Sequence, residues 1–235
     1  MINNFLELYQ NRYGTKQFYE NLLDNIRAKP DNYTTYKSFL SGYEEKVKLE
    51  SSKEKIQTKD GDIRVDLPVW FGNPNAQMKI MLLGQEPRDT DKEGDLNIER
   101  VDKYVFATPF ALERERPIRY HAAFSPLFKK EIDAFIYFTD VVKEYEVTGN
   151  KENDDNLAKK LFLKKAKENS PFLEEEIRII DPTMIIAIGS KSHYFLVRHL
   201  KKSAKKISHP AHRGGIGKAN DQLNELLAEL NLKQS

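Results

Sequence analysis

Four polar residues in this sequence stand where short apolar runs end, and their side chains could act together on a substrate. Gln85 and Glu86 follow KIMLLG, Asp140 ends AFIYFTD, and His209 follows KKIS. A carboxylate opposite a histidine can stabilise a developing positive charge on one side and a developing negative charge on the other. The same carboxylate can orient and deprotonate a water molecule. These residue types indicate a catalytic site, provided that the fold brings them together.

The elements that must position these side chains are short apolar strands separated by amphipathic helices. The apolar runs that predict strands are 79–84, 104–110, 134–140, 183–189 and 205–209. This alternation is typical of a mainly parallel sheet that is covered on both faces. In such sheets the ligand lies at the carboxyl ends of the strands. The four polar residues are therefore expected to meet at one edge of the sheet.

Helical patterns occupy much of the remaining chain. Apolar residues at three- and four-residue spacing predict helices within 1–50 and over 154–181, 190–202 and 220–232. The stretch 51–64 is polar and rich in turn-forming residues, so we expect a connection there.

Composition excludes several classes of protein. The chain has 39% hydrophobic and 31% charged residues and a mean hydropathy of -0.67, which argues against both disorder and membrane insertion. No apolar run approaches the roughly 18–20 residues needed to span a bilayer, and the N-terminus lacks the layout of a signal peptide. The absence of cysteine excludes disulfides and iron–sulfur clusters. We expect a cytoplasmic monomer that needs no cofactor and has no membrane partner.

The charge distribution indicates a partner more clearly than the net charge does. The formal net charge is only +2, but the segment 199–218 is rich in lysine and histidine and contains no acidic residue. A basic segment of this kind is typical of proteins that bind a phosphate backbone. A solvated helix end is the alternative interpretation of the same charge run.

Two other interpretations concern metal ions and aromatic residues. A metal-assisted hydrolase could use Glu86, Asp89, Asp91, His209 and His212, although no HExxH pattern supports it, and we expect no metal. The aromatic residues of VFATPFAL fit a packed core, yet the second of them follows a proline where the strand should end. An aromatic ring at that place could stack on a planar substrate.

Four motifs, in this order, resemble those of the uracil-DNA glycosylase superfamily over about residues 66–230. They are LLGQEPRD, IYFTDVVK, EEEIRIIDPTMIIAIGSKSHYFL and SHPAHR. The resemblance implies a three-layer α/β/α sandwich with a central, mainly parallel four-stranded sheet, to which the helical spacing of the first 50 residues adds N-terminal helices. It divides the chain into an N-terminal helical extension over 1–60, which packs on the domain, and a glycosylase-like domain over 61–235.

The resemblance also implies hydrolysis of the N-glycosidic bond of a base swung out of DNA. Glu86 takes the position of the acid that activates water and stabilises the sugar cation, and His209 takes that of the donor to the leaving base. The base-contacting positions fall on Gln85, Asp140 and Phe110, with Phe106 as the alternative to Phe110.

The expected partner is DNA that carries a damaged or deaminated base. Arg213 occupies the position of the residue that fills the space left by the flipped nucleotide. The cations that we expect on the DNA are Arg88, Arg213, Lys205, Lys206 and Lys218. Extruding a base costs a few kcal/mol, which phosphate contacts of these cations can help to supply.

Four positions depart from the pattern of the family, and one of them is Asp89, which stands where the family has a histidine. Asp140 replaces an asparagine that reads uracil, and an ionised aspartate would repel the O4 oxygen of that base. Arg88 replaces a tyrosine that excludes the methyl group of thymine, and Glu86 is one methylene longer than the usual aspartate. The base is therefore left open among uracil, cytosine-like, modified and deaminated purine bases. A DNA-binding module that keeps the fold but has lost catalysis is the alternative function.

Overall fold

The computed structural model describes most of the segments that the motifs occupy. The described residues are 1–14, 55–57, 63–86, 100–102, 104–106, 122–128, 133–146 and 155–234. Within them, no helix is long and apolar enough to cross a membrane.

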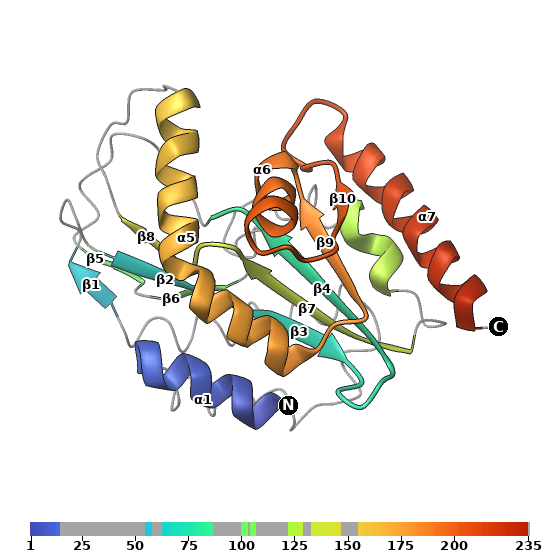
Figure 1. The fold of residues 1–235 in the computed structure, drawn as a ribbon, viewed down its shortest axis with the longest axis horizontal. Coiled ribbons are helices and arrows are strands. Elements are labelled where there is room, and N and C mark those ends of the chain that lie inside the picture. Colours follow the sequence, from blue (N-terminus) through green and yellow to red (C-terminus); the bar gives the residue numbers. More distant parts are fainter. Residues whose placement is uncertain are drawn as a thin grey trace.

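A five-stranded sheet forms the centre of the molecule, in the order β10-β9-β4-β7-β3 (Figure 1). Its strands are β3 (Val69–Gly72), β4 (Met78–Gly84), β7 (Ala134–Asp140), β9 (Met184–Ile188) and β10 (Lys205–Ile207). The pairs β10–β9, β9–β4 and β4–β7 are parallel, and β3 joins β7 in the antiparallel direction. The predicted α/β fold with four parallel central strands is therefore confirmed, with one antiparallel edge strand in addition.

A second, smaller sheet has the order β6-β2-β8. It consists of β2 (Ile63–Leu67), β6 (Tyr104–Phe106) and β8 (Glu144–Glu146), while β1 (Lys55–Gln57) pairs with β5 (Arg100–Asp102). The prediction of a plain connection over 51–64 is therefore wrong, because β1 and the start of β2 lie there. The strand expected in 104–110 does begin at Tyr104, but it pairs with β2 and not with the central sheet.

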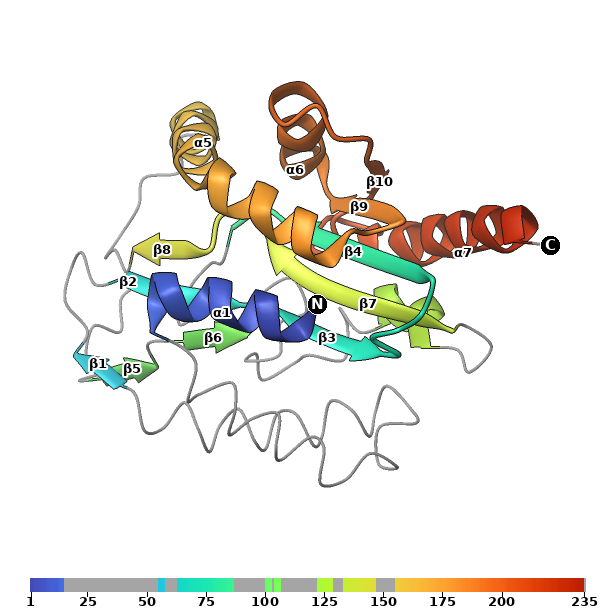
Figure 2. The ribbon, with the colours of Figure 1, turned by 60° about the horizontal axis from the view of Figure 1, so that its bottom comes forward.

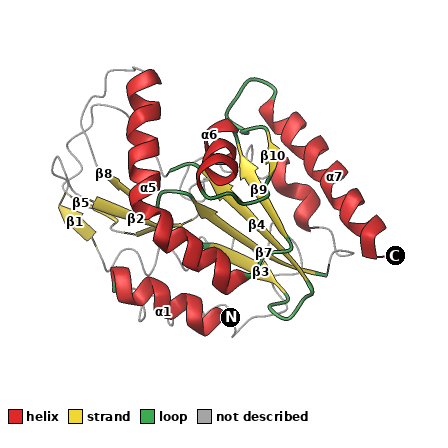
Figure 3. Ribbon diagram, in the orientation of Figure 1, coloured by secondary structure: helices red, strands yellow, loops and turns green. Residues whose placement is uncertain are grey.

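Successive residues of β7 point to opposite faces of the sheet and define the three layers. Tyr137 contacts Phe5 of α1 (Ile2–Tyr13) with ring centroids 5.6 Å apart, and its hydroxyl reaches Glu176 of α5 (Asp155–Ile180). Phe138, on the other face, packs against Phe124 with centroids 5.8 Å apart. Thus α1 and α5 cover one face of the sheet, and the segment around Phe124 covers the other (Figures 2 and 3).

The remaining helices complete these two layers. Phe162 of α5 packs against Phe195, which begins the π-helical turn η4 (Phe195–His199) after α6 (Ser190–Tyr194). On the opposite face, Asn220 of α7 (Gly215–Gln234) donates hydrogen bonds to Ala122 and Ser125 at 2.8 and 3.0 Å. These contacts join α6 to the layer of α5, and α7 to the layer of the 3-10 turn η3 (Ser125–Phe128).

Candidate active site

The ends of β4 and β7 bring Gln85, Glu86 and Asp140 together. Gly84 and Asp140 are register partners, and the amide of Val142 donates to the carbonyl oxygen of Gln85 at 3.1 Å. Gln85 and Glu86 are both half-buried, and the Gln85 Nε2 donates to the Glu86 Oε1 at 3.0 Å. The Glu86 carboxylate is thus held by its neighbour at the carboxyl edge of the sheet.

His209 follows β10 at the same edge of the sheet. The amide of Gly189, which follows β9, donates to the carbonyl oxygen of Ile207 at 2.9 Å, so the two strands end side by side. The His209 Nδ1 accepts a hydrogen bond from the amide of Ala211 at 3.1 Å. This leaves the ring proton on Nε2, which is therefore the donor of the imidazole. Because only β9 separates β10 from β4, the ends of these two strands lie about 10 Å apart, and His209 and Glu86 each follow one of them.

Gly215 fixes the loop that carries His209. A Cβ atom at Gly215 would lie 2.2 Å from the carbonyl oxygen of His209, so no side chain fits at this position without a shift of the backbone. The amide of His212 donates to the same oxygen at 3.1 Å, and the amide of Gly215 donates to the carbonyl oxygen of His212 at 2.7 Å. The loop between β10 and α7 is therefore held against the first turn of α7.

We expect Gly215→Ala to displace this loop and to lower the free energy of unfolding by about 1–3 kcal/mol, as overpacking does elsewhere. The matched control is Gly217→Ala, because nothing lies within 4 Å of a Cβ atom there and alanine favours a helix. Urea denaturation of both variants measures the difference. Equal stability of the two variants would contradict the close approach of Gly215 to His209.

Asp140 is the most deeply buried of the predicted site residues. It is 1% exposed, and neither of its carboxylate oxygens has a hydrogen-bond partner among the described residues. Burial raises the pKa of the Asp140 carboxyl well above its ordinary value, the neighbouring Asp66 raises it further, and Lys143 opposes both. Glu86 adds a smaller contribution in the same direction as Asp66, which places its charge near Asp140.

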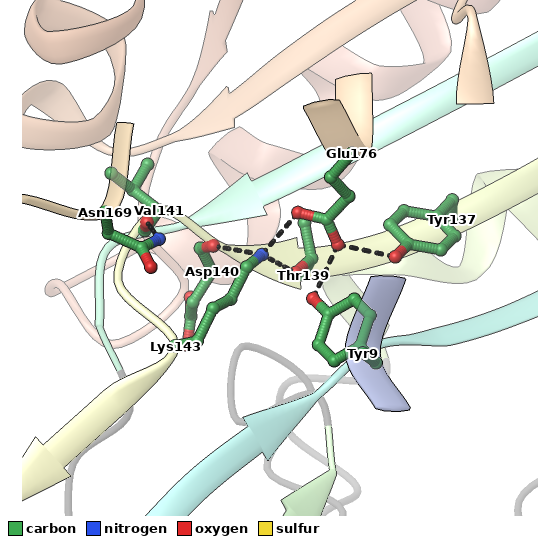
Figure 4. Close-up of polar contacts among 8 residues, drawn as sticks. All are labelled: Tyr9, Tyr137, Thr139, Asp140, Val141, Lys143, Asn169 and Glu176. Carbon is green, nitrogen blue, oxygen red and sulfur yellow. Dashed lines mark hydrogen bonds and ion pairs between the residues drawn. The ribbon is translucent and has the colours of Figure 1, made fainter. Parts of the chain in front are cut away.

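A buried network behind Asp140 holds the end of β7 (Figure 4). The Lys143 Nζ forms an ion pair with the Glu176 Oε2 at 2.7 Å, and both side chains are fully buried. The same ammonium donates to the backbone oxygen of Asp140 at 2.6 Å and to the hydroxyl of Thr139. The Glu176 Oε1 accepts from the hydroxyls of Tyr9 and Tyr137, at 2.6 and 2.5 Å.

Helix α5 supports the same segment at a second point. The Asn169 Nδ2 donates to the carbonyl oxygen of Val141 at 2.7 Å, and this contact is buried. Pro171 lies between Asn169 and Glu176, and the helix is visibly bent in Figure 1. A proline inside a helix removes one backbone hydrogen bond and is a common cause of such a bend. Asn169 thus contacts Val141, and Glu176 contacts Lys143, so α5 holds the chain on both sides of the buried Val142.

The predicted DNA contacts differ in their surroundings. Arg213, Lys206 and Lys218 are exposed, whereas the Lys205 Nζ pairs with the Glu229 Oε2 at 3.1 Å on the protein surface. Lys205 is therefore already partnered within the chain. Phe106 belongs to β6 of the smaller sheet. The other predicted positions lie outside the described residues, namely Arg88, Asp89, Asp91 and Phe110.

Sequence reasoning did not identify Asp66, Lys143, Glu176 or Tyr9 as residues of this region. A signal existed for Glu176, which shares the apolar stripe of α5 with Leu173, Ile177 and Ile180, all of them buried. An acid on such a stripe needs a buried partner. Asp66 was missed because the first residues of its strand, β2, fall in the stretch 51–64, where the sequence analysis expects a connection.

Comparison with known protein families agrees with this geometry. The family model described as the Uracil DNA glycosylase superfamily matches residues 71–231, which include the four parallel strands of the central sheet and the end of β3. No curated protein matches the chain. Within the described residues, no group of three or more His, Cys, Asp or Glu side chains is placed to hold a metal ion. The match spans well over half of the chain, so this protein belongs to the uracil DNA glycosylase superfamily.

Proposed function

We propose that this protein is a DNA glycosylase that hydrolyses the N-glycosidic bond of a flipped, deaminated or otherwise modified base. The observation that carries the proposal is the meeting of Glu86, Asp140 and His209 at one edge of the sheet, in a chain of this family. Cleaving the bond creates a cationic sugar and an anionic base. The site therefore needs a carboxylate on the sugar side and a hydrogen-bond donor on the base side.

In this proposal, Glu86 stabilises the sugar cation and activates the attacking water. The Nε2–H of His209 donates to a carbonyl oxygen of the leaving base, because the Nδ1 of that ring already accepts from Ala211. Gln85 and Asp140 contact the base, and Phe110 stacks on it. The electrostatic stabilisation of a developing oxyanion by one such donor is worth about a hundredfold to a thousandfold in rate.

DNA binding is proposed to use the exposed cations around the His209 loop. Arg213, Lys206 and Lys218 have no acidic residue between them in the sequence, and Arg88 adds a further cation after β4. Contacts of this kind make binding fall steeply as the salt concentration rises. Lys205 would first have to leave Glu229 before it could contact a phosphate.

The experiment that tests the proposal is a base-release assay on oligonucleotides that contain deoxyuridine, deoxyinosine or another modified base. We expect release of the free base from at least one member of the panel, in the absence of added metal or cofactor. Salt-dependent DNA binding without release from any member would contradict the enzyme and would favour a binding module with the same fold.

A further inference from the structure

The buried ion pair of Lys143 and Glu176 is not explained by stability alone. Both side chains are fully buried, with 2.7 Å between the Lys143 Nζ and the Glu176 Oε2. Taking two charges out of water costs about as much free energy as their attraction returns, and apolar residues of similar volume often serve stability equally well. We therefore asked what else the ammonium of Lys143 holds in place.

Two of the three acceptors around this ammonium belong to the end of β7. A lysine has three N–H donors. Those of Lys143 face the Glu176 carboxylate, the backbone oxygen of Asp140 at 2.6 Å and the hydroxyl of Thr139. Thr139 and Asp140 are the last two residues of β7. Because a charged donor forms stronger hydrogen bonds than a neutral one, the ammonium fixes the backbone at the point where this strand ends.

The backbone at Asp140 decides where the carboxyl of this residue lies. Only one methylene separates an aspartate carboxyl from its Cα atom, so the carboxyl moves with the backbone. Asp140 is the register partner of Gly84, and the amide of Val142 donates to the carbonyl oxygen of Gln85 at 3.1 Å. A shift of the chain at the end of β7 would therefore move Asp140 relative to Glu86, which follows Gln85.

Glu176 holds the ammonium from the helix layer. Its Oε1 accepts from the hydroxyls of Tyr9 and Tyr137, at 2.6 and 2.5 Å, while its Oε2 faces the ammonium (Figure 4). The carboxylate is thus fixed on α5 by two donors and directs the ammonium toward the end of β7. Tyr9 belongs to α1, outside the segment 71–231 that the family model matches, so the N-terminal helix contributes to this support.

We propose that Lys143 is a positioning residue, which holds the backbone of Asp140 so that its carboxyl meets the base while Glu86 faces the sugar. This inference rests on the proposed function. The Lys143 side chain is fully buried, so it acts on the base only through Asp140. A displacement of about 1 Å at a reacting group can cost about a hundredfold in rate. Loss of this contact should therefore slow the chemical step and leave DNA binding unchanged.

Three variants separate positioning from stability. Lys143→Met leaves the Glu176 carboxylate without a counterion, and Glu176→Gln leaves the ammonium without one. The double variant Lys143→Met/Glu176→Gln removes both charges and keeps an amide oxygen that can accept from the two tyrosine hydroxyls. We expect the double variant to unfold at a higher urea concentration than either single variant, because it leaves no lone buried charge.

The rates of base release should follow Lys143 and not stability. Under conditions in which every variant is folded, Lys143→Met and the double variant should be about tenfold to a hundredfold slower in single turnover than the wild type. Their half-saturating protein concentrations should stay within about threefold of the wild-type value. Glu176→Gln keeps the ammonium and its bond to Asp140, so its rate should remain closer to that of the wild type. A double variant as fast as the wild type, or rates that rank as the stabilities do, would overturn the proposal.

Backbone amide hydrogen exchange tests the same contact without any activity. The amides of Val141 and Val142 donate to the carbonyl oxygens of Gly84 and Gln85, at 3.2 and 3.1 Å. These two amides should exchange at least about tenfold faster in the double variant than in Glu176→Gln, although the double variant is the more stable of the two. Equal exchange overturns the role of the ammonium, whatever the rates of base release. The expected difference in exchange, in a protein whose wild type releases no base from any oligonucleotide, overturns the glycosylase and not the contact.

Discussion

Replacing Glu86 by glutamine is expected to reduce the single-turnover rate of base release by about a hundredfold to ten-thousandfold. The glutamine keeps the shape of the side chain and its contact with the amide of Gln85, which lies 3.0 Å from Glu86 Oε1. It lacks the negative charge that stabilises a sugar cation, and it cannot accept a proton from water. The measurement is the rate of base release at saturating enzyme, from whichever oligonucleotide the wild type cleaves.

Two controls make the result specific to the chemical step. Glu174→Gln removes a carboxylate from an exposed position of α5 and should leave the rate unchanged. DNA binding by Glu86→Gln should be equal to or tighter than that of the wild type, because a negative charge has been removed near the proposed DNA surface. A rate within threefold of the wild type would contradict the role of Glu86 as the catalytic carboxylate.

Replacing Glu176 by glutamine is expected to lower the free energy of unfolding by about 3–5 kcal/mol, as removal of one partner of a buried ion pair does elsewhere. The hydroxyls of Tyr9 and Tyr137 can still donate to the amide oxygen, so the shape of the network is kept. The Lys143 ammonium, however, is left fully buried without its counterion. Urea denaturation followed by circular dichroism measures the change.

A neighbouring residue on the same helix provides the matched control. Glu175 also forms an ion pair, with Arg178 at 2.6 Å, but on the protein surface, where water screens the charges. Glu175→Gln is therefore expected to change the unfolding midpoint very little. If Glu176→Gln were equally harmless, another carboxylate, such as Asp140, would have to balance the charge of Lys143.

The central strands were predictable because burial on both faces leaves a plain signal in the sequence. The run 79–84 corresponds to β4, 134–140 to β7 and 183–189 to β9, each within two residues at either end. Parallel strands of this kind also fix where their carboxyl ends lie. The meeting of Glu86, Asp140 and His209 at one edge followed from that rule and from the residues that stand after each strand.

The buried polar contacts around Asp140 could not be predicted in the same way. Asp66 lies in a five-residue strand of the smaller sheet, and Lys143 lies in the segment that leads from β7 to β8. Nothing in the spacing of these residues states that they face each other, because their contact depends on how the two sheets pack. The rise in the pKa of Asp140 depends on that packing too, because burial and the neighbouring Asp66 cause it, so it could not be predicted from the sequence.

Helix α1 has a consequence for how this protein can be divided. Phe5 and Tyr9 are buried against Trp70, Tyr137 and Phe172, while the family model begins at residue 71. A truncated protein that begins near residue 61 would expose that apolar surface and leave Glu176 with one hydroxyl fewer. We therefore expect a protein that begins near residue 61 to be less stable than the full chain, because α1 covers part of the core on which the family's strands are built.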